Sequence, residues 1–298
     1  MSVNKSNNSA QFYGKLAVFF CATLWSTSGL FIKLIDAHPF VIAGLRSFIA
    51  AILMISIRLA FPRRSSGPAA ESLKKTMRIP AFWFAGFAYA AVMILFVIAN
   101  KLTASANVIL LQYSAPAWAA IFAAILLHEK PAVENWISLI MVAGGLVLFF
   151  KDALAAGSLL GDILAVVSGI ALGANSVLLK MIKDGNPADG MLLAHIITAV
   201  VGIPFLILFP FAISGGATGA LLFMGIFQVG FASILYSYGI QRISSVAALI
   251  IACIEPVLNP VWVLIVTGEK PALSAIIGGA IIIAAVLVST LTSVIRKR

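Results

Sequence analysis

Charged residues are scarce in this chain of 298 residues. Asp, Glu, Lys and Arg together make up 10% of it, whereas 62% of the residues are hydrophobic and the mean hydropathy is +1.10. Soluble domains contain about 25% charged residues, so a water-soluble globular protein is excluded. The chain has only two cysteines, Cys21 and Cys253, and both lie in apolar stretches. We therefore predict neither a disulfide framework nor a thiolate metal site.

The sequence also lacks the motifs of common enzymes. His128-Glu129 has no second histidine four residues after the first, as a zinc-protease helix requires, and no glycine-rich phosphate loop precedes a lysine. We therefore predict that the protein is not an enzyme and uses no cofactor and no metal. Although the net charge is +10, the basic residues lie at loops and helix ends, so no nucleic-acid partner is expected.

Long apolar runs fill most of the chain, and a helix of about 20 apolar residues crosses a bilayer. Charges and Gly/Pro clusters divide the runs into ten predicted spans: 15–35, 39–61, 80–100, 103–127, 132–150, 158–180, 190–213, 218–240, 244–267 and 272–295. The fold class predicted from these spans is an all-α polytopic membrane protein with ten transmembrane helices. Its partner is the lipid bilayer.

The basic residues are distributed unevenly about these spans. Fifteen of the 20 Lys and Arg residues fall on one side of the predicted bilayer, four fall on the other, and Arg46 lies within a span. The positive-inside rule then places both termini in the cytoplasm, with the protein in the plasma (inner) membrane. The connection from Pro62 to Pro80 carries five of these charges. Retention on the cytoplasmic side explains them, and a contact with anionic lipid is the alternative.

An internal repeat divides the chain into two halves. Glu129-Lys130-Pro131 recurs 140 residues later as Glu269-Lys270-Pro271, and the same offset relates Pro116 to Pro256 and Ser105 to Ser245. Each half holds five spans, and an odd number of crossings makes the second half enter from the opposite side. We predict two inverted five-helix repeats, 15–150 and 151–295, flanked by cytoplasmic tails at 1–14 and 296–298.

Two long segments and Arg46 resemble a known family. Segments 110–131 (LLQYSAPAWAAIFAAILLHEKP) and 250–271 (IIACIEPVLNPVWVLIVTGEKP) are similar to the EamA-type members of the drug/metabolite transporter superfamily, most of all to bacterial exporters of aromatic and other amino acids. The resemblance implies a central cavity formed mainly by the first four helices of each repeat. The chain departs from a symmetric pattern because Arg46 has no clear counterpart in the second half, where His195 is misaligned by about one residue.

Glu255 is the only acidic residue deep within a predicted span. It lies eleven residues after Ser244, or about 16 Å along a helix, near the middle of the bilayer. The functional interpretations are proton coupling or binding of a substrate ammonium; the alternative is a carboxyl that braces the helix near Pro256. Three prolines, Pro116, Pro256 and Pro260, are expected to loosen their helices for a rocking motion, unless they only shape the bundle.

Other polar and aromatic residues at membrane depth are candidate substrate contacts. With Glu255, the predicted substrate-binding set is Trp25, Tyr89, Asn100, Asn107, Gln112, Tyr113, Trp118 and Asn175. A polar side chain in a bilayer needs a partner, which is either a water-filled cavity or a neighbouring helix. Met93 and Phe96 share a helix face with Tyr89 but are interpreted as a packing seam.

These observations predict a transporter that exports amino acids, including aromatic and bulky apolar ones, by alternating access. An exporter of lipophilic cations or other small metabolites is the alternative, since Glu255 and the aromatic residues suit a cation as well. An intramembrane enzyme and a channel are weaker hypotheses. Proton antiport, uniport and every oligomeric state remain open at this point.

Overall fold

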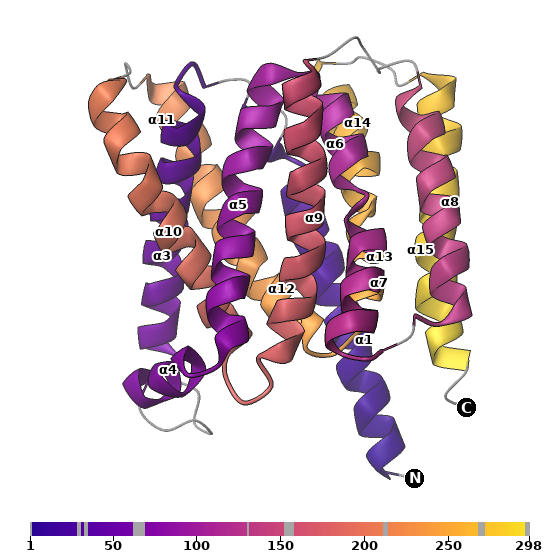
Figure 1. Ribbon diagram of the computed structural model, residues 1–298. Coiled ribbons are helices and arrows are strands. Elements are labelled where there is room, and N and C mark those ends of the chain that lie inside the picture. The colour runs from indigo at the N-terminus through magenta and orange to yellow at the C-terminus, as the bar shows by residue number, and fades with distance from the viewer. Residues whose placement is uncertain are drawn as a thin grey trace.

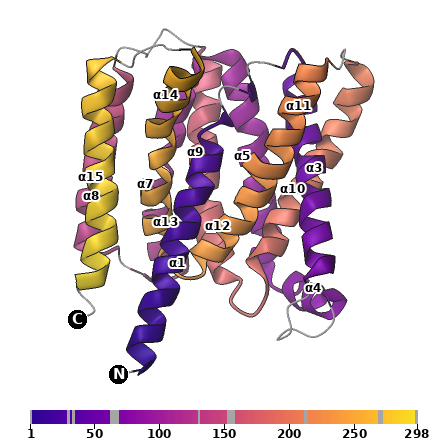
Figure 2. The ribbon, with the colours of Figure 1, turned by 180° about the vertical axis from the view of Figure 1, so that it is seen from behind.

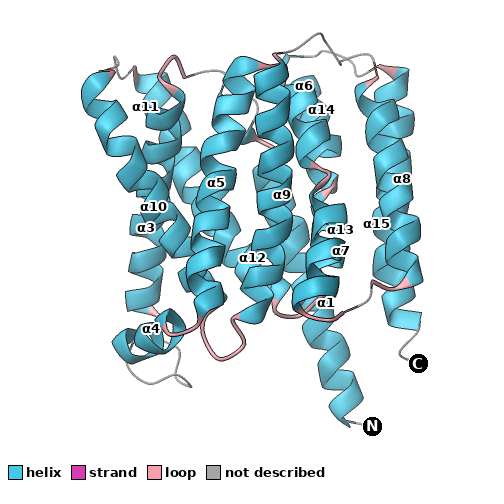
Figure 3. Cartoon of the chain, in the orientation of Figure 1, coloured by secondary structure: helices cyan, strands magenta, loops and turns pink. Residues whose placement is uncertain are grey.

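The computed structural model describes residues 2–28, 31–32, 35–61, 69–129, 131–151, 158–210, 214–267 and 272–295 (Figure 1). Within this part of the chain every regular element is a helix, as Figure 3 shows by its uniform colour. Lys130 and the second Glu-Lys-Pro turn lie outside the described residues. So does the side chain of Pro260.

The predicted all-α polytopic membrane fold is confirmed, and the described helices agree with a count of ten spans. Eight spans are long and apolar enough to cross a bilayer, and α1 together with the pair α13–α14 completes the ten. The helices of the first half are α1 (Ser2–Trp25), α3 (Pro39–Ala60), α5 (Pro80–Leu102), α6 (Ser105–Gln112) with α7 (Ala115–Leu126), and α8 (Val133–Phe150). Those of the second half are α9 (Leu159–Met181), α10 (Pro187–Leu208), α11 (Gly215–Phe223), η1 (Met224–Phe231) and α12 (Ala232–Ile240), α13 (Ser245–Ala252) with α14 (Ile254–Thr267), and α15 (Leu273–Ile295).

The helix boundaries follow local sequence signals that hydropathy does not weigh. Proline occupies the first turn of α3, α5 and α10, where its missing N–H costs nothing. The Asn186 side chain caps α10 by accepting from the Ala188 backbone N–H, so this helix begins at Pro187 rather than at the predicted residue 190. The largest difference is α1, which begins at Ser2 and so extends through much of the predicted tail.

The two halves pack in a pattern expected of inverted repeats. Corresponding helices pair directly, α3 with α10 and α8 with α15, while α5 packs on α9 just as α1 packs on α12. Figures 1 and 2 place the start of α1 and the end of α15 at the same end of the bundle. We call this the terminal end. The short helix α4 (Ala69–Met77) lies there too, beside the end of α3.

Glycine permits the closest helix contacts. A Cβ atom added to Gly44 in α3 would lie 2.8 Å from the Cα of Gly202 in α10, and one added to Gly173 in α9 would lie 2.8 Å from the carbonyl oxygen of Ala115. Real Cβ atoms do not approach other atoms so closely, and small residues are the usual means of bringing membrane helices together. These contacts set the backbone positions around the interior of the bundle.

The fourth span of each repeat is broken at the same place. α6 ends at Gln112, before a turn at Tyr113 and Ser114, and α13 ends before Cys253, which is 140 residues after Tyr113. Pro116 and Pro256 follow these breaks, and a proline cannot donate to the carbonyl four residues earlier. The carbonyls of Gln112 and Ala252 therefore lose their usual helical partners near the middle of the bundle.

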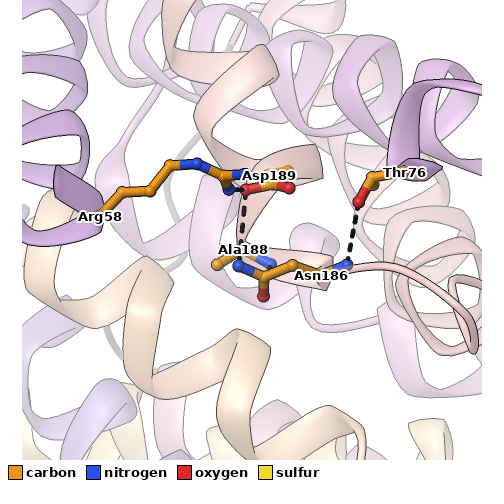
Figure 4. A network of polar contacts seen from close by, with 5 residues as sticks. All are labelled: Arg58, Thr76, Asn186, Ala188 and Asp189. Atoms are coloured by element: carbon orange, nitrogen blue, oxygen red, sulfur yellow. Dashed lines mark hydrogen bonds and ion pairs between the residues drawn. The ribbon is translucent and has the colours of Figure 1, made fainter. Parts of the chain in front are cut away.

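A polar network fastens the terminal end (Figure 4). Arg58, in the last turn of α3, forms an ion pair with Asp189 in the first turn of α10. The Asn186 side chain donates to Asp189 at 3.4 Å, and the Asn186 backbone N–H donates to Thr76 Oγ1 of α4 at 3.1 Å. These contacts join α3, α4 and α10.

Candidate functional site

A cavity lies within the bundle, between side chains from both repeats. Its volume is about 40 Å³, and its wall comes from α1, α3, α5, α6, α9, η1 and α14 and from the turn after α1. The lining residues are Trp25, Ser28, Arg46, Tyr89, Val92, Met93, Phe96, Gln112, Leu172, Gln228, Val229 and Glu255. A water molecule needs about 10–15 Å³ by this measure, so the cavity as it stands holds a few waters and no organic solute.

Arg46 places a positive charge on one part of this wall. Its side chain is 1% exposed, and Nη2 donates to the Met93 carbonyl oxygen at 3.1 Å. Among the described residues no carboxylate lies within 4.0 Å of the guanidinium, and Nε has no hydrogen-bond partner. A buried charge without a counter-ion is costly, so this position favours an anionic group entering the cavity.

Other polar atoms of the wall are also unpaired. In the described part of the chain no hydrogen-bond partner is found for Trp25 Nε1, the Tyr89 hydroxyl or Gln228 Oε1. Each such buried group costs about 1–3 kcal/mol until water or a ligand satisfies it. The wall therefore offers donors and an acceptor to a polar ligand. Met93, Phe96 and Leu172 provide apolar surface beside them.

Glu255 provides the acidic group of the cavity and is tied to the other repeat. The Tyr113 hydroxyl lies 2.5 Å from Glu255 Oε2 and 3.0 Å from the Ala252 carbonyl oxygen, and its one proton can be donated to either acceptor. The second acceptor is the carbonyl that Pro256 leaves without its helical donor. A hydrogen bond thus joins the helix break of the first repeat to the helix break of the second. Glu255 lines the cavity and is 7% exposed.

The structure brings together four of the nine predicted substrate contacts: Trp25, Tyr89, Gln112 and Glu255 line the cavity. Tyr113 is not a lining residue, but its hydroxyl contacts the carboxyl of Glu255. The Gln112 amide also donates to Ser168 Oγ of α9 at 2.7 Å, so its orientation is held from outside the cavity.

The other four predicted contacts do not line the cavity: Asn107 and Asn175 bind a neighbouring helix, whereas Asn100 and Trp118 contact residues of their own helices. Asn100 donates to the Phe96 carbonyl at 2.9 Å, Asn175 donates to the Ala85 carbonyl at 3.0 Å, and Asn107 approaches Asp162 at 3.4 Å. Trp118 is only partly buried and stacks on Phe122, with 6.4 Å between ring centroids. The amide nitrogens of these three residues thus donate to protein groups rather than to the cavity.

Sequence reasoning did not select several cavity residues. Arg46 was noted only for its family resemblance, although it is the one basic residue far from the ends of a predicted span, which is by itself a signal of function. Met93 and Phe96, interpreted as a packing seam, line the cavity. Gln228 and Val229 belong to the π-helical segment η1, and such segments occur frequently at functional sites.

His195 packs against Tyr89, one of the residues that line the cavity. It is fully buried, its Nε2 lies 2.9 Å from Ser233 Oγ, and its ring meets the Tyr89 ring edge to face at 5.9 Å between centroids. The residue therefore positions Tyr89 without touching the cavity. His195 is the ninth residue of α10 and Arg46 the eighth of α3, so the two do not occupy equivalent positions in the repeats.

Comparisons with known proteins agree with this architecture. The profile of the EamA-like transporter family matches residues 12–151 and again residues 159–291. A protein of Archaeoglobus fulgidus described as an uncharacterized transporter is 25% identical over 280 residues, which cover 93% of this chain and 96% of that protein. A crystal structure described without a function is 21% identical, with a TM-score of 0.76 over 94% of this chain and 96% of that chain. The last of these likenesses concerns the fold alone.

Proposed function

Since this chain belongs to the EamA-like transporter family, we propose that it exports amino acids, including aromatic and bulky apolar ones, by alternating access through the central cavity. One observation carries the proposal. The cavity is lined by one cation, Arg46, and one carboxyl, Glu255, which are not paired with each other. A zwitterion presents the complementary pair of charges.

The remaining wall suits the rest of an amino acid. The Arg46 guanidinium binds a carboxylate with paired N–H groups, a geometry that gives strong and directional hydrogen bonds. The ammonium group faces Glu255 and gains cation–π attraction from Trp25 or Tyr89, worth about 0.5–2 kcal/mol. Phe96, Met93 and Leu172 accommodate an apolar side chain. A lipophilic cation, the main alternative substrate, is repelled by Arg46 and leaves its donors unused.

Alternating access follows from the size of the cavity and the form of the helices around it. About 40 Å³ is too small for an amino acid, so the wall has to open before substrate enters. The breaks before Pro116 and Pro256 and the π-helical η1 supply segments whose backbone hydrogen bonds are already interrupted. We take the repeats, 15–150 and 151–295, as the two units that rock about the central site.

We expect purified protein in proteoliposomes to catalyse counterflow of tryptophan and phenylalanine, with saturation. Phe96→Ala should raise the half-saturation concentration for tryptophan about tenfold, or about 1.4 kcal/mol, but that for threonine much less, because Phe96 belongs to the apolar wall that accommodates the side chain. Trp118→Ala is the matched control, since Trp118 lies away from the cavity. A flux that never saturates would indicate a channel instead. Transport of lipophilic cations without any amino acid would overturn the assignment.

We also propose that both termini lie in the cytoplasm of a cell with this protein in its plasma membrane. Lys74, Lys75 and Arg78 lie exposed at the terminal end, which the positive-inside rule assigns to the cytoplasm. In a background of Cys21→Ser and Cys253→Ser, Ser214→Cys should react with an impermeant thiol reagent in intact cells. Lys74→Cys should react only after the cells are opened. The reverse pattern would invert the orientation.

A further inference from the structure

A second hollow lies on the outer surface of the bundle, between α3 and α10. Its volume is about 430 Å³, and it is lined almost entirely by aliphatic side chains and glycine, with Phe48 as its one aromatic group. It shares no lining residue with the central cavity. Both helices are membrane spans, so this groove opens toward the hydrocarbon region of the bilayer.

The groove exists because its floor is made of glycine. Gly44 and Gly202 both line it, and they bring the two backbones so close that no side chain fits between them. Larger side chains rise on either side: Phe48 and Ile52 of α3 are 55% and 50% exposed, and Val200 of α10 is 57% exposed. The result is a furrow along the helix pair with an apolar wall on each side.

Positive charge gathers at one end of this groove. Ile55 is its last lining residue on α3, and Arg58 follows three residues later, about 4.5 Å along the helix axis. Arg58 is already paired with Asp189. The helix α4, joined to the start of α10 through Thr76 and Asn186, adds exposed Lys74 and Lys75.

We propose that the α3–α10 groove binds one acyl chain of an anionic phospholipid, whose phosphate is held by Lys74 and Lys75 of α4. The apolar furrow lies at membrane depth and ends where a headgroup would sit. Basic residues beside a membrane surface attract anionic headgroups over zwitterionic ones. Glu71 and Arg78, also exposed beside the lysines, offset each other in charge.

A lipid fits this surface better than a second copy of the chain. A two-fold dimer through the groove would bring two α3–α10 faces together and would place one basic α4 near the other at the same membrane surface. Like charges at such an interface oppose association. A lipid chain fills the furrow without that repulsion.

Native mass spectrometry of the purified full chain tests the proposal, with equal amounts of phosphatidylglycerol and phosphatidylcholine added in detergent. We expect one tightly held phosphatidylglycerol per chain. Lys74→Gln with Lys75→Gln should weaken its binding about 25-fold, at about fivefold for each lysine. Lys151→Gln, at the opposite end of the bundle, is the matched control and should leave binding unchanged.

The groove itself is tested by a filling substitution. Ala199, a partly buried residue of the groove wall, is replaced in Ala199→Phe; Ala143→Phe, on an exposed face of α8, is the control. Ala199→Phe should abolish retention of phosphatidylglycerol while the control retains it. Equal retention of the two lipids, binding unaffected by Ala199→Phe and by the lysine variants, or a dimer that Ala199→Phe dissociates would each overturn the proposal. Because none of these measurements involves transport, their result is independent of the proposed substrate.

Discussion

Arg46→Gln should weaken the apparent affinity for every transported amino acid by about 10- to 100-fold. A hydrogen bond to a charged group contributes about 1.5–3 kcal/mol, and the substitution removes the one cation that lines the central cavity among the described residues. Glutamine removes a buried charge that has no counter-ion within 4.0 Å among the described residues, and it keeps an amide donor on the side of α3 that faces Met93. The amount of folded protein should therefore change little.

The measurement is counterflow normalised to folded protein, with tryptophan compared against the amine that lacks its carboxylate. Wild-type protein should prefer tryptophan, and Arg46→Gln should remove most of that preference, because only the amino acid carries the group that Arg46 binds. Arg46→Lys retains the charge but not the planar guanidinium that binds a carboxylate through two N–H groups, so we expect an intermediate preference for tryptophan. If Arg46→Gln kept the wild-type preference for tryptophan, the guanidinium would have a structural role only.

The fold was predictable from the sequence because the bilayer imposes few solutions. Backbone groups in hydrocarbon must be satisfied within their own helix, so the apolar runs could form only spans. The 140-residue offset then related Pro116 to Pro256, and the structure has a helix break just before each. Helix starts such as that of α10 were less accurate, since a cap depends on single hydrogen bonds that hydropathy averages away.

The candidate site was only partly predictable, for a reason that Asn175 and Gln112 illustrate. Both are amides at membrane depth, and the sequence gives no sign of which way each helix is rotated in the bundle. The Asn175 amide meets a backbone carbonyl of α5, whereas Gln112 borders the cavity. For Gln228 the difficulty is greater, because η1 is π-helical and residues on one face no longer recur at the α-helical spacing.

The geometry around Glu255 suits a carboxyl that gains and loses a proton. When it is ionised, the Tyr113 hydroxyl donates to Oε2; when it is protonated, the carboxyl donates to Tyr113, whose own proton then goes to the Ala252 carbonyl. Both forms are satisfied by the same three groups without a change of side-chain position. On the proposed function, substrate ammonium and proton occupy the carboxyl in turn, which is the requirement for exchange of one against the other.

Glu255→Gln should accordingly abolish amino acid flux driven by a pH gradient, because a side-chain amide does not gain or lose a proton near neutral pH. Exchange of one amino acid for another needs no proton and should persist, with a half-saturation concentration raised about 10- to 100-fold by the loss of the ammonium's counter-charge. Both fluxes are measured in proteoliposomes with the same protein content. Since glutamine matches glutamate in size, folding should be preserved.

Tyr113→Phe separates this role from bracing. It removes the bond between the two helix breaks, including the donor to the Ala252 carbonyl, but leaves the carboxyl in place. A lost buried hydrogen bond should lower the stability of the folded protein by about 1–3 kcal/mol, while the pH-gradient-driven flux per folded molecule persists. If Glu255→Gln behaved in the same way, with reduced stability and both fluxes intact, Glu255 would only brace the broken helices and the proton would have to be carried elsewhere.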